Sequence, residues 1–102
     1  MDLDYFEDQI CDEFDGAEDY AKKAIENKVI YPDWSKTFNT MAEVEMDHAK
    51  NLYDMCAKYY QKITTSYNPE DIPSNIQNRW TSISLTYAEK FAKVSALLKC
   101  YE

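Results

Sequence analysis

Apolar residues recur along the chain at alternating steps of three and four, which is the spacing of one face of an α-helix. Two stretches rich in turn residues interrupt the pattern, from Asn27 to Asp33 and from Ser66 to Pro73, and the second contains two prolines that cannot both lie inside a helix. The pattern therefore predicts three helices, at about 3–28, 33–66 and 74–100. Helices of this length pack stably only side by side, so the expected fold class is an all-α bundle.

The composition agrees with this prediction, because the 102 residues include one Gly and three Pro. We expect residues 1–102 to form a single helical domain, near the minimum size for a self-sufficient core. The formal net charge of −8 argues against nucleic acid and anionic membranes as partners, since both carry phosphate. We expect the protein to bind metal cations instead. The alternative, that acidity only keeps a small protein soluble, stays equally open.

The cysteines, Cys11, Cys56 and Cys100, lie far apart and form no Cys-x-x-Cys pair. Such a set predicts neither a disulfide framework nor a thiolate zinc site, and it fits a reducing compartment. The first residues are acidic, and no run approaches the roughly 18 apolar residues of a membrane span. We therefore expect a soluble, cytoplasmic protein with no membrane partner.

Each predicted helix carries one seam, defined as the residues that recur at these steps of three and four. The seams are Leu3, Phe6, Ile10, Glu13, Ala17, Tyr20 and Ala24 in the first helix, Trp34, Phe38, Met41, Glu45, His48, Leu52, Met55 and Tyr59 in the second, and Ile76, Trp80, Ile83, Tyr87, Phe91, Val94, Leu98 and Tyr101 in the third. We expect the seams to face the interior of the bundle. The other acids of the first two helices, Glu7 and Glu18 among them, are expected in solvent.

Three ionisable residues, Glu13, Glu45 and His48, interrupt two otherwise apolar seams. Burying an unpaired carboxylate costs several kcal/mol, so an acid on an interior seam is normally neutralised, paired or bound to a metal. Glu45 and His48 lie one turn apart on one face, so both can reach one metal ion. An acid of the facing helix can then serve as a bridging ligand. Carboxylates with one imidazole per metal suit iron or manganese better than zinc. The alternative is a pair of buried acids satisfied by His48 and a tyrosine hydroxyl.

Residues 13–21 and 41–52 resemble the first two helices of the ferritin-like superfamily, especially its rubrerythrin branch. The likeness covers roughly residues 5–60, and it consists of a Glu seven residues before a Tyr, a helix break, and the motif Ala-x-x-Glu-x-x-His-Ala at Ala42 to Ala49. The resemblance implies that Glu13 and Glu45 are carboxylate ligands of a di-iron centre and that His48 is its imidazole ligand. It also implies that Tyr20 is an aromatic residue beside the metal pocket.

A complete ferritin-like chain has four helices and two such half-motifs, whereas this sequence predicts three helices and one half-motif. Antiparallel pairing with a second copy would bring together four carboxylates and two imidazoles, the ligand set of a di-iron bundle. The resemblance thus implies a four-helix bundle completed in a homodimer or a higher oligomer of dimers. The half-length encapsulated ferritins share this plan, so a protein shell or capsid is a further expected host. The third helix would either cover the first two or join dimers through Trp80, Tyr87 and Phe91.

Iron(II) at such a centre is open to oxidation by dioxygen or peroxide, so the leading hypothesis is a ferroxidase, with manganese as the alternative metal. The competing hypothesis is a non-enzymatic acidic assembly protein with a ferritin-like fold, such as a structural subunit of a virion or complex. The nine tyrosines are most simply packing aromatics, although some would quench one-electron leakage from a metal centre.

Overall fold

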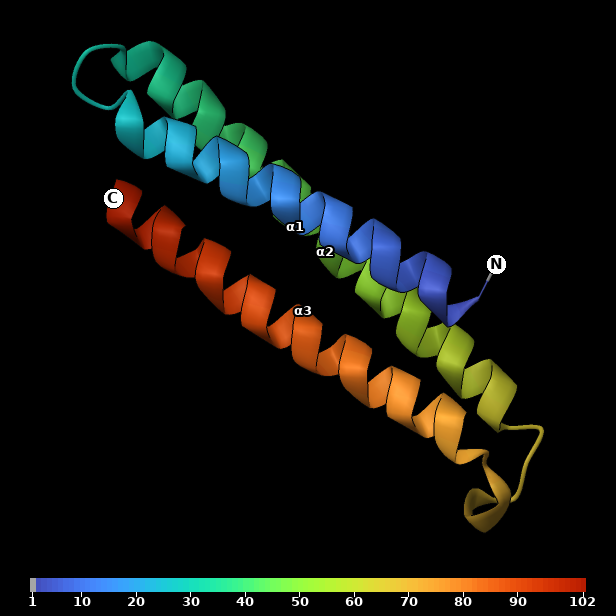
Figure 1. Cartoon of the computed structure of the whole chain (residues 1–102). Helices are drawn as coiled ribbons and strands as arrows, with labels where there is room; N and C mark the ends of the chain where they lie inside the picture. Colours follow the sequence, from blue (N-terminus) through green and yellow to red (C-terminus); the bar gives the residue numbers. More distant parts are fainter. Residues whose placement is uncertain (1) are drawn as a thin grey trace.

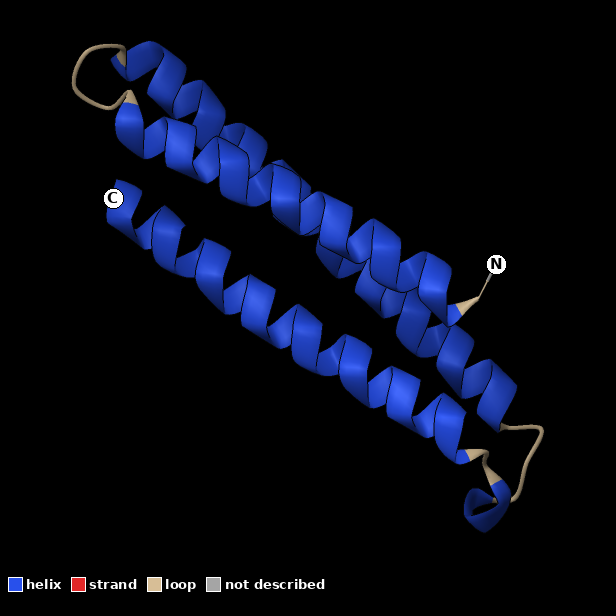
Figure 2. Cartoon of the chain, viewed as in Figure 1, coloured by secondary structure: helices blue, strands red, loops and turns tan. Residues whose placement is uncertain are grey.

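The structure, a computed structural model, describes residues 2–102 as three long helices that lie side by side in a rod of 58 × 19 × 16 Å (Figure 1). Helix α1 spans Leu3–Glu26, α2 spans Pro32–Thr64 and α3 spans Ser74–Tyr101, with a 3-10 turn, η1, at Pro69–Asp71. Each helix end lies within two residues of the bound that the sequence predicts. Within the described residues Figure 2 shows helices and loops without strands, which confirms the all-α fold class.

The ends of the helices follow from capping and from proline. At α1 the side chain of Asp2 accepts a hydrogen bond of 2.9 Å from the backbone N–H of Tyr5. Pro32 is the first residue of α2, where its missing N–H leaves no helical hydrogen bond unmade, and Pro73 directly precedes α3. Because both connections are short, each helix runs antiparallel to the one before it, and α3 is parallel to α1 (Figure 1).

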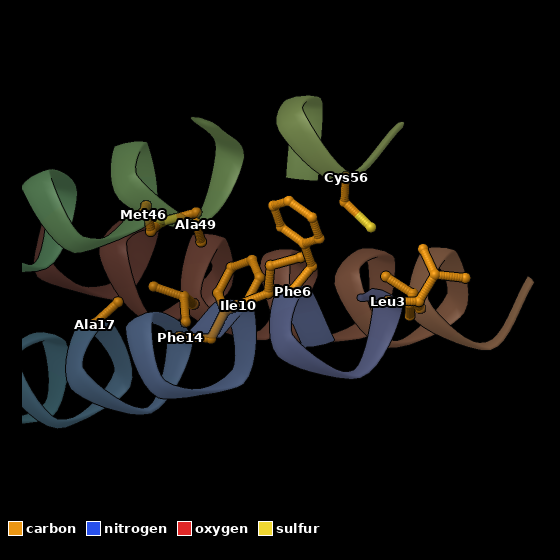
Figure 3. Packing of buried hydrophobic residues seen from close by; sticks show 10 residues of the cluster. Leu3, Phe6, Ile10, Phe14, Ala17, Met46, Ala49 and Cys56 are labelled. Atoms are coloured by element: carbon orange, nitrogen blue, oxygen red, sulfur yellow. The ribbon is translucent and has the colours of Figure 1, made fainter. Parts of the chain in front are cut away.

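The core lies along the face of α1 that meets both other helices. Phe6, Ile10 and Phe14 of α1 are almost fully buried, and Figure 3 shows them beside Met46 and Cys56 of α2. Helix α3 completes the cluster with two buried residues, Ile83 and Val94. Each large apolar side chain removed from water contributes about 1.5–3 kcal/mol, so this cluster is the main source of stability in the single chain.

The buried face of α2 is not the predicted seam. Its buried residues are Ser35, Ala42, Met46, Ala49 and Cys56, each of which directly follows a seam residue in the chain. One residue is a rotation of about 100° around a helix, so the seam lies to the side of the core. Trp34 and Met55 are accordingly 59% and 52% exposed. In α1, Phe14 and Ala21 are buried where Glu13 and Tyr20 were expected. The prediction that both seams face the interior of the chain is therefore wrong at these positions.

Aromatic rings fill the space between α2 and α3. Tyr53 stacks on Trp80 and on Tyr87, with ring centroids 5.3 and 4.1 Å apart, and Tyr60 stacks on Trp80 at 5.1 Å. Tyr87 also meets Phe14 of α1 edge-on at 5.5 Å. Of the two roles considered for the third helix, these contacts show that Trp80 and Tyr87 cover the first two helices within the chain.

Ion pairs between α1 and α3 fix how the two helices lie along each other. Lys93 Nζ lies 2.9 Å from Glu18 Oε1, and Arg79 Nη1 lies 3.3 Å from Glu7 Oε2. Two more pairs, Arg79–Asp4 and Lys90–Asp15, lie on the same interface. Glu7 and Glu18 thus lie against α3, which corrects the expectation that they extend freely into solvent.

Replacing Lys93 by Met is expected to lower the free energy of unfolding by about 0.5–1 kcal/mol at neutral pH. Hydrogen bonds from Lys22 and Lys93 hold the pKa of Glu18 below its ordinary value. A carboxyl whose pKa is lowered by folding stabilises the fold above its unfolded pKa of about 4.3, and this contribution is lost as the pH falls through the folded value. Urea unfolding followed by circular dichroism should therefore show a smaller loss at pH ~3 than at pH ~7.

Lys99→Met is the matched control, because Lys99 lies on the same helix and makes no ion pair with any described residue. It should change the stability little at either pH. If Lys93→Met lowered the free energy of unfolding by the same amount in acid and at neutral pH, the pairing with Glu18 would not be the cause of the lost stability.

Candidate metal centre

Glu13 of α1 meets Glu45 and His48 of α2 where the two helices pack together. Each offers one ligand atom, and these atoms all lie within 4.8 Å of one another. His48 Nδ1 is 3.4 Å from Glu13 Oε2. The structure therefore brings together the three residues that the sequence selected, one from α1 and two from consecutive turns of α2.

The group faces away from α3. Residues five apart on a helix point about 140° apart. Glu13 lies five residues before Glu18, which pairs with Lys93 of α3, and His48 lies five residues before Tyr53, which stacks on Trp80 of α3. The group is consequently only partly buried: the side chain of Glu13 is 25% exposed and that of His48 51%. The expectation that these side chains face the interior is therefore not met within one chain.

The Glu45 carboxyl group lies against that of Glu13, and this contact raises the pKa of Glu45. A hydrogen bond with Glu13 is the main cause that raises the pKa of Glu45; burial and the charge of Glu13 act in the same direction, and His48 opposes them. Two carboxylates in contact cannot both ionise cheaply without a compensating positive charge. A metal cation can supply that charge in place of the proton, and carboxylate oxygens with an imidazole nitrogen are donors that suit iron or manganese. The donor set thus fits a metal ion of this kind.

Gly16, the only glycine of the chain, lies directly against the Glu45 carboxyl group. A Cβ atom built at Gly16 would lie 3.5 Å from Glu45 Oε2, which is ordinary van der Waals contact, so the space there admits about one more carbon atom. The sequence prediction missed this residue. The available signal was a glycine inside a helix, where it costs roughly 0.5–1 kcal/mol relative to alanine and therefore calls for a reason.

Tyr20, the fourth residue singled out from the sequence, lies farther along α1, also in contact with α2. Its ring stacks on Phe38 of α2, with centroids 6.2 Å apart and planes 20° apart. About 10 Å of helix rise separates it from Glu13. Its part in the chemistry of the site stays a prediction.

A helical hairpin that carries a Glu–Glu–His group, covered on one side by a third helix, is consistent with the class of ferritin-like helical proteins. A family model described as Rubrerythrin matches residues 4–94, and the chain therefore belongs to the rubrerythrin family of the ferritin-like superfamily. This confirms the resemblance seen in the sequence. Domains of this family bind iron. Searches of curated proteins and of solved structures give no significant match.

No helix within residues 2–102 combines the length and the hydrophobicity that a membrane span requires.

Replacing Gly16 by Ala is expected to raise the free energy of unfolding by about 0.5–1 kcal/mol, because alanine favours the helix and its Cβ fits the available space. Gly16→Leu should be less stable than Gly16→Ala, since the longer side chain must displace the Glu45 carboxyl group. Urea unfolding of the metal-free protein measures both. Ala92→Leu, at an exposed position of α3, gives the cost of the same change without a neighbour and should stay within about 0.5 kcal/mol. Equal stability of the two Gly16 variants would mean that Glu45 does not limit this space.

Proposed function

We propose that this protein is a di-iron ferroxidase whose metal centre is completed by a second copy of the chain. The observation that carries the proposal is the meeting of Glu13, Glu45 and His48 within 4.8 Å, in a family whose domains bind iron. Glu13 and Glu45 supply carboxylate oxygens, His48 supplies an imidazole nitrogen, and Tyr20 forms part of the pocket wall. Manganese(II) is the alternative occupant, because it accepts the same donors.

The position of the three ligands along the rod supports a symmetric dimer. Glu13 lies near the middle of α1, Leu3–Glu26, and Glu45 and His48 lie near the middle of α2, Pro32–Thr64. A two-fold axis through this point would bring two ligand sets together while the two hairpins overlap along their whole length. Ligands near one end of the rod would leave much of each hairpin unpaired. Two copies would supply four carboxylates and two imidazoles, the set expected of a di-iron bundle.

The exposed apolar residues of α2 support the same arrangement. Trp34, Met41 and Met55 are exposed and belong to the seam that contains Glu45 and His48. Apolar side chains on both sides of a ligand group are costly in water, and a second hairpin packed there would bury them. The seam predicted from the sequence then corresponds to an interface between copies. Its closure would also exclude water from the half-open site, which strengthens the interaction of each carboxylate with a cation.

In this centre the residues of the chain would bind and orient the metal. A carboxyl group of the site would lose its proton as the metal binds. Bound iron supplies one-electron chemistry toward dioxygen or peroxide. A cation favours the ionised form of Glu45, whose pKa is raised by the contact with Glu13, so that metal binding would be coupled to proton release. His48 binds as a neutral imidazole, and its contact with Glu13 orients the ring.

A second candidate function is that of a structural assembly subunit. Val29 and Ile30, at the turn between α1 and α2, are 90% and 75% exposed, which favours further contacts at the end of the rod. Such contacts suit a larger oligomer of dimers or a shell or capsid that encloses the protein. Under this hypothesis the protein purifies without stoichiometric iron, and His48→Ala is tolerated. We propose a cytoplasmic location for either function, inside a protein compartment if such a host exists.

Glu45→Ala and His48→Ala are each expected to weaken iron(II) binding by more than about 100-fold, because even the outer partners of metal ligands contribute 10–100-fold. Iron(II) oxidation should be lost with it, while circular dichroism shows unchanged helix content. Titration calorimetry under argon and the absorbance of iron(III) after addition of oxygen or peroxide measure the two effects. Asp47→Ala, an exposed acid between the two ligands on α2, should retain both. Full iron oxidation by Glu45→Ala would refute the assignment.

Met41→Lys is expected to abolish the iron-loaded dimer by placing a charge in the proposed interface, one helical turn from Glu45. Native mass spectrometry and analytical ultracentrifugation should then show a monomer, and iron should be lost together with the dimer. Leu85→Lys, an exposed apolar position of α3, is the control and should remain dimeric. A wild-type chain that binds its full iron complement as a monomer would contradict the two-copy centre.

A further inference from the structure

Gly16 completes a four-residue arrangement with the three candidate ligands, which consists of Glu13 and Gly16 on α1 and of Glu45 and His48 on α2. On each helix the two positions are three residues apart, which places them one turn apart on one face. Because α1 and α2 are antiparallel, His48 lies beside Glu13, with Nδ1 3.4 Å from Oε2, and Glu45 lies beside Gly16. Three of the four positions thus carry a ligand group, and the fourth carries no side chain.

The neighbours of Gly16 show what its missing side chain leaves room for. The three heavy atoms nearest to a Cβ atom built at this position all belong to Glu45: Oε2 at 3.5 Å, Cδ at 3.6 Å and Cγ at 3.8 Å. Each distance is an ordinary van der Waals contact, and none of the three atoms belongs to the backbone of α2. The unfilled space at Gly16 therefore borders the carboxyl group of a candidate ligand.

Packing of the two helices does not by itself account for a glycine at this position. Glycine is required where two backbones come too close for a Cβ atom, whereas an alanine at position 16 would meet its neighbours at ordinary contact distance. No positive φ angle calls for glycine either, because the backbone is helical there. After proline, glycine is the least favourable residue in the interior of a helix. The chain thus gives up helix stability at a position that faces Glu45.

Binding of one metal ion by both carboxyl groups requires a change at Glu45. In the structure its carboxyl group lies in contact with that of Glu13. Carboxylate oxygens lie about 2.0–2.2 Å from a bound divalent ion such as zinc, so each group must direct an oxygen toward the ion instead of toward the other group. Oε2 and Cδ of Glu45 border the space at Gly16, so the carboxyl group has room to turn in this direction.

We propose that Gly16 is a positioning residue, whose missing side chain leaves the Glu45 carboxyl group room to turn from Glu13 toward a bound metal ion. The inference rests on the proposed function, because it concerns the binding of iron(II) by Glu45. Gly16 itself contributes no ligand atom. An alanine at this position would hold the Glu45 carboxyl group where the structure shows it, and it would hinder the turn without disturbing the two helices.

Gly16→Ala separates this role from a packing role, because only the positioning role predicts that stability and metal affinity change in opposite directions. The metal-free variant is expected to be more stable than the wild-type chain, yet to bind iron(II) about 10-fold more weakly. Urea unfolding of the metal-free protein measures the stability, and titration calorimetry with iron(II) under argon measures the affinity. Native mass spectrometry should show the same fraction of dimer for both proteins. A variant that loses affinity only together with the dimer would overturn the role of Gly16.

Ser82→Ala is the matched control, since Ser82 is an exposed position of α3 at which alanine also favours the helix. It should raise the stability of the metal-free protein and leave the affinity for iron(II) unchanged. Equal iron(II) affinities of Gly16→Ala and the wild-type chain would overturn the role of Gly16 while the proposed function stands. A wild-type chain that binds no iron(II) would overturn both.

A second test follows the Glu45 carboxyl group directly. Crystal structures of the wild-type chain without metal and after loading with iron(II) under argon should show this group closer to the backbone of Gly16 in the loaded protein. In Gly16→Ala the group should keep one position whether or not iron(II) is present. A Glu45 carboxyl group that stays in place when the wild-type chain binds iron(II) would overturn the proposal, whatever the affinities are.

Discussion

Close packing of α1 on α2 is the interaction on which the rest of the structure depends. Five alanines, Ala17, Ala21, Ala24, Ala42 and Ala49, are at most 1% exposed and line the contact. Small side chains let two helix axes approach toward the near end of the usual 8–10 Å range. This packing brings the carboxyl group of Glu13 on one helix into contact with that of Glu45 on the other. Gly16 lies at the same contact, where an added Cβ atom would meet the Glu45 carboxyl group at ordinary van der Waals distance.

Helix α3 covers one side of this hairpin and leaves the other side open. Its ion pairs with Glu7 and Glu18 and its aromatic contacts with Tyr53 hold it against that one side. The apolar residues of the open side have no cover within the chain, and the ligand group lies among them. A small domain of three helices cannot enclose two faces of a hairpin at once. The proposed dimer follows from this geometric deficit as much as from the number of ligands.

The contact between Glu13 and Glu45 is unfavourable when both carboxyl groups are ionised, and a bound cation would offset this repulsion. The carboxyl groups of Glu13 and Glu45 lie within 4.8 Å of each other, and their contact raises the pKa of Glu45. If the group binds a metal ion as proposed, its three donors are already close together within one chain. The stacked rings of Tyr53, Trp80 and Tyr87 lie on the other side of the hairpin, where they hold α3 against it.

The sequence by itself determined the helices and selected Glu13, Glu45 and His48 as candidate ligands, because proline and turn residues end helices locally and because Glu45 and His48 share a face of any helix. It could not determine which face of α2 is buried. Met41–Ala42, Met55–Cys56 and their neighbours offer two adjacent apolar stripes, and periodicity alone favours the one with larger side chains. The docking of α1 selected the alanine stripe, since closer packing is possible there. The contact of Gly16 with Glu45 and the stacking of Tyr53 with Tyr87 likewise exist only in the tertiary structure, because each joins residues of different helices whose relative rotation no local pattern specifies.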